Sequence, residues 1–131
     1  MNVDIDMTRQ YYDECTDEDC CSCGYCQAYR RQVRNAYPEV SAYLDRLGID
    51  IGKPAESIYW DIDQEGLVGF IASYWVFGAG GHFEHMVGDI KVYTDNMSYN
   101  VPPRVAAVEH SGHFVLSVSV IQIHTGIKRE S

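Results

Sequence analysis

The chain has 131 residues, of which 46% are hydrophobic and 22% charged; this composition excludes a disordered chain, and we expect residues 1–131 to form one globular domain. Its 19 acidic and 10 basic residues give a formal net charge of −9. This charge disfavours nucleic acid as a partner and favours a basic protein surface or a metal ion.

The first 26 residues form an acidic segment that contains every cysteine of the chain. Five cysteines fall within residues 15–26, whereas thiols that only fill a core would be scattered along the sequence. Cys20-x2-Cys23, followed directly by Gly24, and Cys23-x2-Cys26 have the spacing of zinc knuckles. We therefore predict an N-terminal cysteine knuckle that binds a structural zinc ion through four of five thiolates: Cys15, Cys20, Cys21, Cys23 and Cys26.

Other interpretations of the cysteines stay open. Cys15-x4-Cys20-x2-Cys23 has the spacing of three ligands of plant-type ferredoxins, but the sequence contains no distant fourth cysteine for an iron–sulfur cluster. Cys23-Gly24-Tyr25-Cys26 looks like the CGYC active site of thioredoxin-fold disulfide isomerases and directly precedes a predicted helix. The acidic residues before it disfavour a thiolate. Some of the thiols, Cys21 for example, can also simply be reduced side chains without a function.

A helical region follows at residues 25–48. Tyr25, Tyr29 and Val33 recur at a spacing that places them on one helix face, toward the core, and three arginines point outward from this helix. Pro38 and Gly48 mark the first turn and the end of a second helix. The three arginines are Arg30, Arg31 and Arg34. We expect these arginines, or a metal ion, to neutralise part of the acidic segment.

The pattern changes to strands after Lys53-Pro54. Ser57–Ile62 and Leu67–Phe77 flank a four-residue loop that ends in glycine, which predicts a hairpin. Together with two helices, residues 57–124 predict an α+β fold with an antiparallel sheet of about five strands. The remaining predicted strands are Asp89–Thr94, Arg104–Glu109 and His113–His124.

Four histidines form two H-x2-H pairs, His82 with His85 and His110 with His113. Such pairs can chelate a metal ion, and they can equally well stand in loops without a ligand. The sequence has no nucleophile elbow, no zincin motif and no Ser–His–Asp signature, so it favours a protein that is not an enzyme.

The N-terminal residues MNVDIDMTRQ lack the basic and apolar regions of a signal peptide. The longest apolar stretch, Leu67–Phe77, is interrupted by polar residues and is too short to span a membrane. We therefore expect a cytoplasmic protein without a membrane partner, in a compartment where thiols stay reduced.

One resemblance covers most of the chain. The run Tyr37-Pro38-Glu39-Val40, with Tyr43-Leu44 and Leu47-Gly48-Ile49-Asp50 after it, is preceded by the cysteine cluster and followed by a strand that ends Val76-Phe77-Gly78. It resembles a set of small uncharacterised bacterial proteins. The resemblance implies the same compact α+β fold and no particular activity.

The sequence thus predicts a small zinc-binding interaction or regulatory module whose unknown macromolecular partner is a protein. One alternative is a thiol–disulfide redox enzyme that uses Cys23 and Cys26. A second alternative is an acidic inhibitor or immunity-type protein that binds a basic partner. We expect the contact surface at the aromatic strand Tyr74–Phe77 and at an unprotected sheet edge, through which a homodimer can form.

Overall fold

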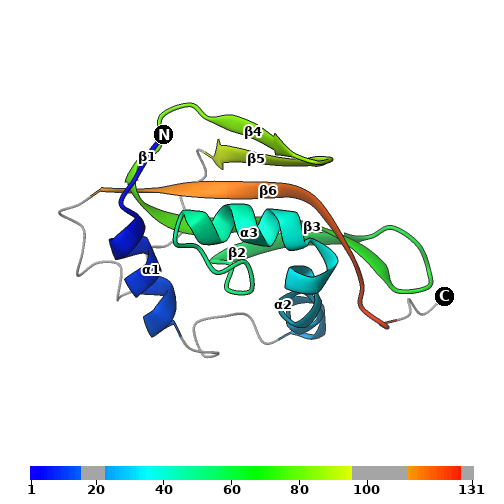
Figure 1. The fold of residues 1–131 in the computed structure, drawn as a ribbon. Coiled ribbons are helices and arrows are strands. Elements are labelled where there is room, and N and C mark those ends of the chain that lie inside the picture. The colour runs from blue at the N-terminus through cyan, green and yellow to red at the C-terminus, as the bar shows by residue number, and fades with distance from the viewer. Residues whose placement is uncertain (16–22, 96–111, 128–131) are drawn as a thin grey trace.

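In the computed structural model, residues 1–15, 23–95 and 112–127 are described. They form three helices and six strands, and the fold is α+β (Figure 1). The elements in chain order are β1 (Asn2–Val3), α1 (Ile5–Glu14), α2 (Gly24–Ala36), α3 (Pro38–Arg46), β2 (Glu56–Asp61), β3 (Leu67–Ala79), β4 (Glu84–Val87), β5 (Ile90–Asp95) and β6 (His113–His124).

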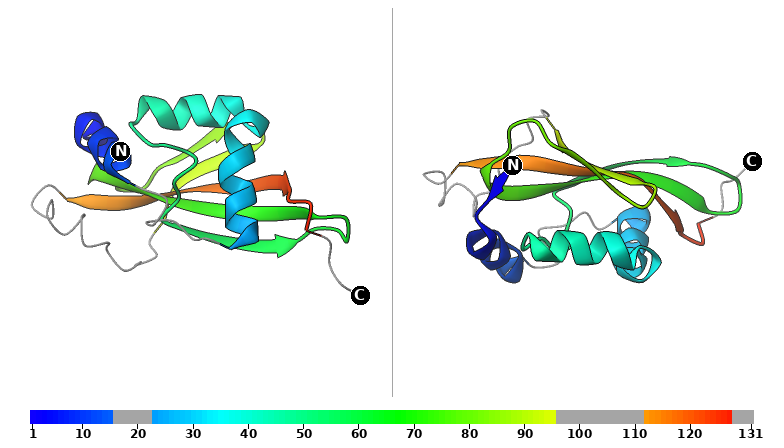
Figure 2. Two further views of the ribbon diagram at one scale, coloured as in Figure 1. Left: turned by 90° about the horizontal axis from the view of Figure 1, so that it is seen from below. Right: turned by 45° about the horizontal axis from the view of Figure 1, so that its top comes forward.

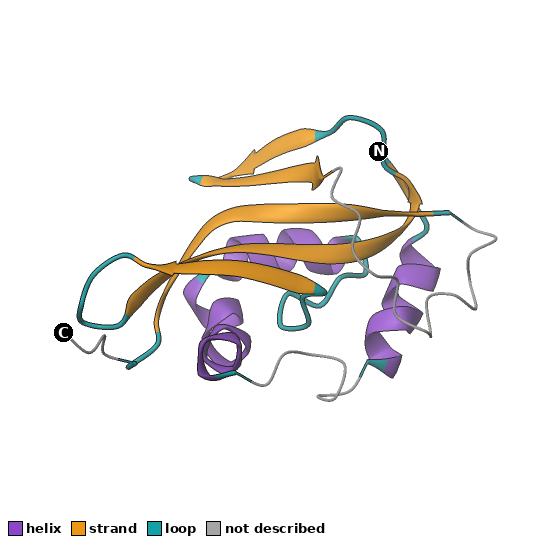
Figure 3. Cartoon of the chain, turned by 180° about the vertical axis from the view of Figure 1, so that it is seen from behind, coloured by secondary structure: helices purple, strands orange, loops and turns teal. Residues whose placement is uncertain are grey.

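The strands form one antiparallel sheet with the order β1-β3-β6-β5-β4, and β2 pairs with β3 on the same side as β1. The two long strands, β3 and β6, lie at the centre. Their register shifts between Phe70 and Ile71, where β6 carries an extra residue, Val120. Such a bulge increases the local twist, in keeping with the curled sheet in Figure 3.

All three helices lie on one side of the sheet (Figure 2). Alternate residues of β3 and β6 point toward them, because successive strand residues face opposite sides. This face forms the main core with α2, α3 and the loop after α3, and its largest fully buried side chains include Tyr29, Tyr74, Phe70, Leu44, Ile49, Ile51, Leu116, Ile121 and Ile123. The core therefore holds the N-terminal part of α2 against the sheet.

Helix α1 lies in a region where the sequence predicted only an acidic cysteine-rich segment. Asp4 caps it, and its carboxylate accepts a hydrogen bond from the backbone N–H of Met7 (3.1 Å). Thr8 and Tyr12 are buried four residues apart on one helix face. The prediction of two helices was thus incomplete, because two buried residues, Thr8 and Tyr12, anchor an otherwise polar helix through hydrogen bonds to β3.

The predicted helices over residues 25–48 are confirmed as α2 and α3. Val33 and Tyr29 are fully buried on α2, and Pro38 stands in the first turn of α3. Gly48 adopts φ +86°, and an added Cβ would lie 2.7 Å from the backbone oxygen of Ile5. Glycine is therefore required there both for the backbone conformation and for the close approach of α1.

The predicted strands are confirmed for β2, β3, β5 and β6, while β4 was missed because its four residues are mostly exposed. The predicted strand Arg104–Glu109 lies outside the described residues. The expected contact surface at Tyr74–Phe77 was wrong, because all four side chains are buried in the central strand. In the described part of the chain, no helix is both long and apolar enough to cross a bilayer.

Candidate functional site

Cys23 and Cys26 come together at the start of α2. Cys23 is the N-cap residue, and its Sγ accepts a hydrogen bond from the backbone N–H of Cys26 (3.4 Å). Cys23 is partly buried, whereas Cys26 is only 6% exposed. Residues three apart at a helix start lie on one face, so both sulfurs are presented at the same helix end. The N–H groups of that end favour a negative charge on the capping sulfur.

The sheet holds Cys26 from the other side. Its Sγ lies 3.6 Å from the hydroxyl oxygen of Ser57 on β2. Beside it is a hollow of about 340 Å³, which is also lined by Arg30, Glu56 and Tyr59. The inner thiol therefore borders a small space whose wall includes the basic residue Arg30.

Two further contacts fix the Gly24-Tyr25 pair between the cysteines. Tyr25 stacks on Tyr59 of β2, with ring centroids 4.7 Å apart. A Cβ on Gly24 would lie 3.0 Å from the side chain of Ile127, so glycine lets the segment after β6 pack over the helix start. These contacts hold the first turn of α2 between β2 and the segment after β6.

The structure tests only part of the predicted five-cysteine zinc site. Cys15 is buried at the C-terminal end of α1, where its N–H bonds to the carbonyl oxygens of Tyr11 and Tyr12. Within residues 1–15, 23–95 and 112–127, no three His, Cys, Asp or Glu side chains gather in a group that could bind a metal ion. Cys15 thus does not join Cys23 and Cys26 in such a group. Cys20 and Cys21 lie outside the described residues, so the zinc site stays a prediction.

The histidines are engaged mainly by aromatic rings. His85 stacks on Tyr43 (centroids 5.1 Å apart), and His113 meets Trp75 edge to face (5.3 Å). His82 is exposed and lines a separate shallow hollow beside β5. His110 lies outside the described residues. A second metal site at these histidines therefore gains no support from the described geometry.

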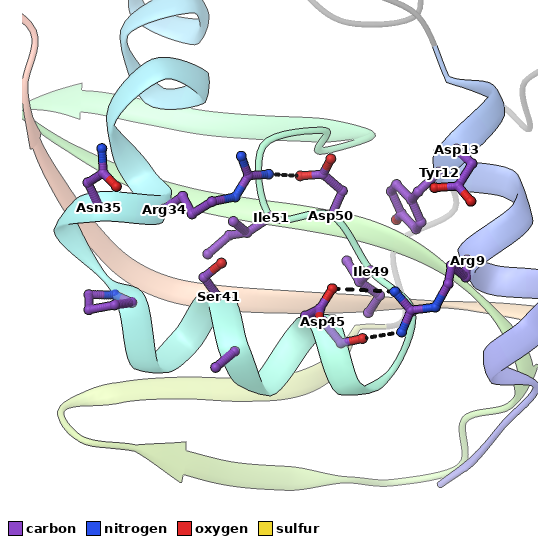
Figure 4. Close-up of a pocket in the computed structure, with 13 residues that line it drawn as sticks. Arg9, Tyr12, Asp13, Arg34, Asn35, Ser41, Asp45, Ile49, Asp50 and Ile51 are labelled. Carbon is purple, nitrogen blue, oxygen red and sulfur yellow. Dashed lines mark hydrogen bonds and ion pairs between the residues drawn. The ribbon is translucent and has the colours of Figure 1, made fainter.

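A larger hollow of about 580 Å³ separates α1 from α2 and α3 (Figure 4). Two arginines point into it, and each is held by a carboxylate. Arg34 pairs with Asp50 (2.5 Å), and Arg9 bonds to both the side chain (3.4 Å) and the backbone oxygen (2.8 Å) of Asp45. Because their charges are balanced within the wall, these groups join the helices to the loop after α3 and give no net charge for an anionic ligand.

The residues that complete the thiol site could be anticipated only in part. Arg30 follows Cys26 by one helical turn, so a helix prediction places it nearby. Ser57 and Ile127 are distant in sequence and reach the site through the pairing of β2 with β3 and the path of the chain after β6. No local sequence signal marks them.

Chemically, the site offers one partly exposed sulfur and one buried sulfur at a helix N-terminus. Neither Cys23 nor Cys26 is in a disulfide. Two such thiols can be oxidised to a disulfide, or can supply two ligands to a thiophilic metal ion. Comparisons of the chain with models of protein families, with curated proteins and with solved structures found no match.

Proposed function

We propose that Cys23 and Cys26 form a redox-active dithiol and that the protein exchanges thiols with disulfides. The observation that carries the proposal is the capping geometry: the partly exposed Cys23 sulfur accepts the N–H of Cys26, whose own sulfur is buried behind it. An accessible attacking thiol with a shielded second thiol three residues later is the arrangement that such exchange needs.

The exchange proceeds in two steps that transfer two electrons. The Cys23 thiolate attacks one sulfur of a partner disulfide, forms a mixed disulfide and releases the other partner sulfur as a thiolate. The Cys26 thiol then loses its proton and attacks the Cys23 sulfur, which releases the second partner thiol. The Cys23–Cys26 disulfide is the oxidised product, and the partner disulfide has been reduced to two thiols.

The described surroundings support the order of attack. Cys26 lies against Ser57 and lines the hollow with Arg30, so a bulky disulfide reaches Cys23 first. The Arg30 guanidinium, which donates to the Gly52 oxygen (3.2 Å), places a positive charge beside the hollow. Because Cys26 lines this hollow and Cys23 does not, the charge assists the second step, in which Cys26 loses its proton.

The test uses glutathione as the partner disulfide. In a chain with Cys15, Cys20 and Cys21 replaced by serine, oxidised glutathione should give an intramolecular disulfide, seen as the loss of two alkylatable thiols. In that background Cys26→Ser should accumulate the mixed disulfide with glutathione, while Cys23→Ser should not. Serine is also a good N-cap residue, so Cys23→Ser preserves the helix start. Equal trapping in both variants would contradict the assigned roles.

The second candidate is the metal-binding, non-catalytic interaction module. It is favoured by the two cysteines that stand three and two residues before Cys23, because Cys20 and Cys21 would complete a set of four thiolates with Cys23 and Cys26. Elemental analysis of reduced protein purified without chelator should then give one zinc per chain, and chelator should lower the melting temperature. Cys15→Ser should leave the zinc content unchanged, and protein without stoichiometric zinc would contradict this candidate.

A further inference from the structure

The face of β2 and β3 that points away from the helices carries an apolar patch. Of seven large hydrophobic side chains that are exposed in the described part, four lie in residues 58–62. Tyr59 turns toward the helices, where it stacks on Tyr25. Ile58 and Trp60 alternate with it on β2 and therefore lie on the other face, with exposed fractions of 47% and 39%. Ile62 directly follows β2, and its N–H donates to the Leu67 oxygen (2.9 Å), which continues the same pairing; it is 42% exposed.

The neighbouring strand extends this patch. Ile71 pairs with Ile58, and Gly69 pairs with Trp60. A Cβ on Gly69 would come within 2.8 Å of the indole, so the Trp60 ring lies flat on the glycine and turns its outer face to solvent. Leu67 and Ile71 are only partly buried. Together these side chains form what we call the β2–β3 platform: Ile58, Trp60, Ile62, Leu67 and Ile71.

Ionisable side chains stand at two opposite corners of the platform. Glu56 pairs with Ser73, and His124 pairs with Leu67, so both lie on the platform's face and both are exposed. Midway between residues 67 and 73 on β3 is residue 70, and β3 itself lies midway between β2 and β6. The point halfway between Glu56 and His124 therefore lies on β3, beside Gly69 and Ile71 of the platform's face.

We propose that two copies of the chain dimerise by packing their β2–β3 platforms face to face. The two-fold axis lies in the plane of the interface, perpendicular to the line from Glu56 to His124 and through its midpoint. Rotation about this axis brings each Glu56 opposite His124 of the second copy. The imidazole N–H can then donate to the carboxylate in two symmetric contacts around an apolar centre. This self-complementarity favours a second copy over a foreign protein, whose charges would have to match both corners by chance.

The first test is the mass of the protein by sedimentation equilibrium from about 1 to about 500 µM, where a micromolar dimer dissociates. The wild type should reach twice the 14.9 kDa chain mass. Ile58→Lys and Ile62→Lys should weaken the dimer about a hundredfold, because each would bury unpaired charges. Met86→Lys is the matched control, since Met86 is 55% exposed but lies on β4 at the other edge of the sheet.

A charge exchange tests the orientation. Glu56→Lys alone and His124→Glu alone should each weaken the dimer about tenfold, and the double variant should recover it, because lysine then faces glutamate in both contacts. Circular dichroism of each variant would show that the fold is kept. A wild type that stays at 14.9 kDa throughout would overturn the proposal. Dissociation of Met86→Lys to the same extent as Ile58→Lys, or no recovery in the double variant, would also overturn it.

Discussion

A buried pair of tyrosines gives a sharp test of how the core is held together. The hydroxyl groups of Tyr29 and Tyr74 are 2.6 Å apart, and the Tyr74 hydroxyl donates to the backbone oxygen of Ile51, also at 2.6 Å. Because the one proton of Tyr74 goes to Ile51, Tyr29 must be the donor between the tyrosines. All three residues are at most 1% exposed.

Because of this hydrogen-bond direction, the same substitution of tyrosine by phenylalanine should reduce the unfolding free energy by different amounts at positions 29 and 74. Tyr29→Phe removes a donor and leaves the Tyr74–Ile51 bond in place, so it should cost about 1 kcal/mol of unfolding free energy. Tyr74→Phe leaves both the Ile51 oxygen and the Tyr29 hydroxyl unpaired, at about 1–3 kcal/mol each, or about 2–6 kcal/mol together. The double variant should cost less than the sum, because only the Ile51 oxygen then lacks a partner.

Urea denaturation of the wild type and the three variants measures these differences. Tyr43→Phe is the control, since Tyr43 is only partly buried and its ring contact with His85 survives the change. Equal losses for Tyr29→Phe and Tyr74→Phe, or a larger loss for Tyr29→Phe, would refute the assigned hydrogen-bond direction.

Three further predictions concern stability and are also measured by urea denaturation. Burial raises the pKa of the hydroxyl groups of Tyr12, Tyr29 and Tyr74. Above a pH of about 10 the unfolded chain therefore loses protons that the folded chain keeps. The unfolding free energy should then fall by up to about 1.4 kcal/mol per pH unit for each of these tyrosines. An unfolding free energy that stays constant between pH 8 and 11 would contradict this expectation. Gly78→Ala should destabilise more than Gly126→Ala, because both have positive φ but only at Gly78 would the Cβ meet a backbone atom, the Asn2 oxygen at 2.1 Å. Equal effects would show that β1 does not depend on this contact. Thr8→Val should cost about 1–3 kcal/mol, because the buried Thr8 hydroxyl accepts the Phe77 N–H (3.2 Å), while Thr8→Ser keeps that bond. Equal unfolding free energies of Thr8→Val and Thr8→Ser would show that the hydrogen bond to the Phe77 N–H does not stabilise the fold.

The parts of the fold that the sequence predicted are those with strong local signals. Pro38 and Gly48 bound α3, and the five-residue loop between β2 and β3 ends in a glycine with φ +94°. Such signals act within a few residues, and tertiary packing did not override them. Helix α1 was not predicted, because its stability depends on contacts with residues that are distant in the sequence. The Tyr12 hydroxyl, for example, donates to the Trp75 oxygen (2.8 Å), 63 positions away.

The burial of Tyr74–Phe77 could not be predicted for a similar reason. Bulky groups on both faces of a strand are compatible either with a central, twice-covered strand or with an exposed partner surface. Only the pairing of β3 with β6 on one side and with β1 and β2 on the other decides between them. The apolar surface lies one strand away, on β2, where the sequence alternates isoleucine and tryptophan with residues that face α2.

The thiol site was predictable in its local part alone. The sequence placed Cys23 and Cys26 directly before a helix, and they lie at its N-cap and in its first turn. It did not indicate that Cys26 packs on Ser57, or that Cys15 is buried at the C-terminal end of α1. Both facts depend on how the helices sit on the sheet, which local spacing does not encode.

The most direct measurement for the proposed dithiol is disulfide mapping of the wild-type chain. The protein is equilibrated with oxidised and reduced glutathione, its remaining thiols are alkylated, and its peptides are analysed by mass spectrometry. We expect a reversible disulfide between Cys23 and Cys26, with Cys15 alkylated only after unfolding because it is buried. Recovery of Cys23 and Cys26 as reduced thiols at every glutathione ratio, or their linkage to other cysteines instead of to each other, would contradict the proposed function.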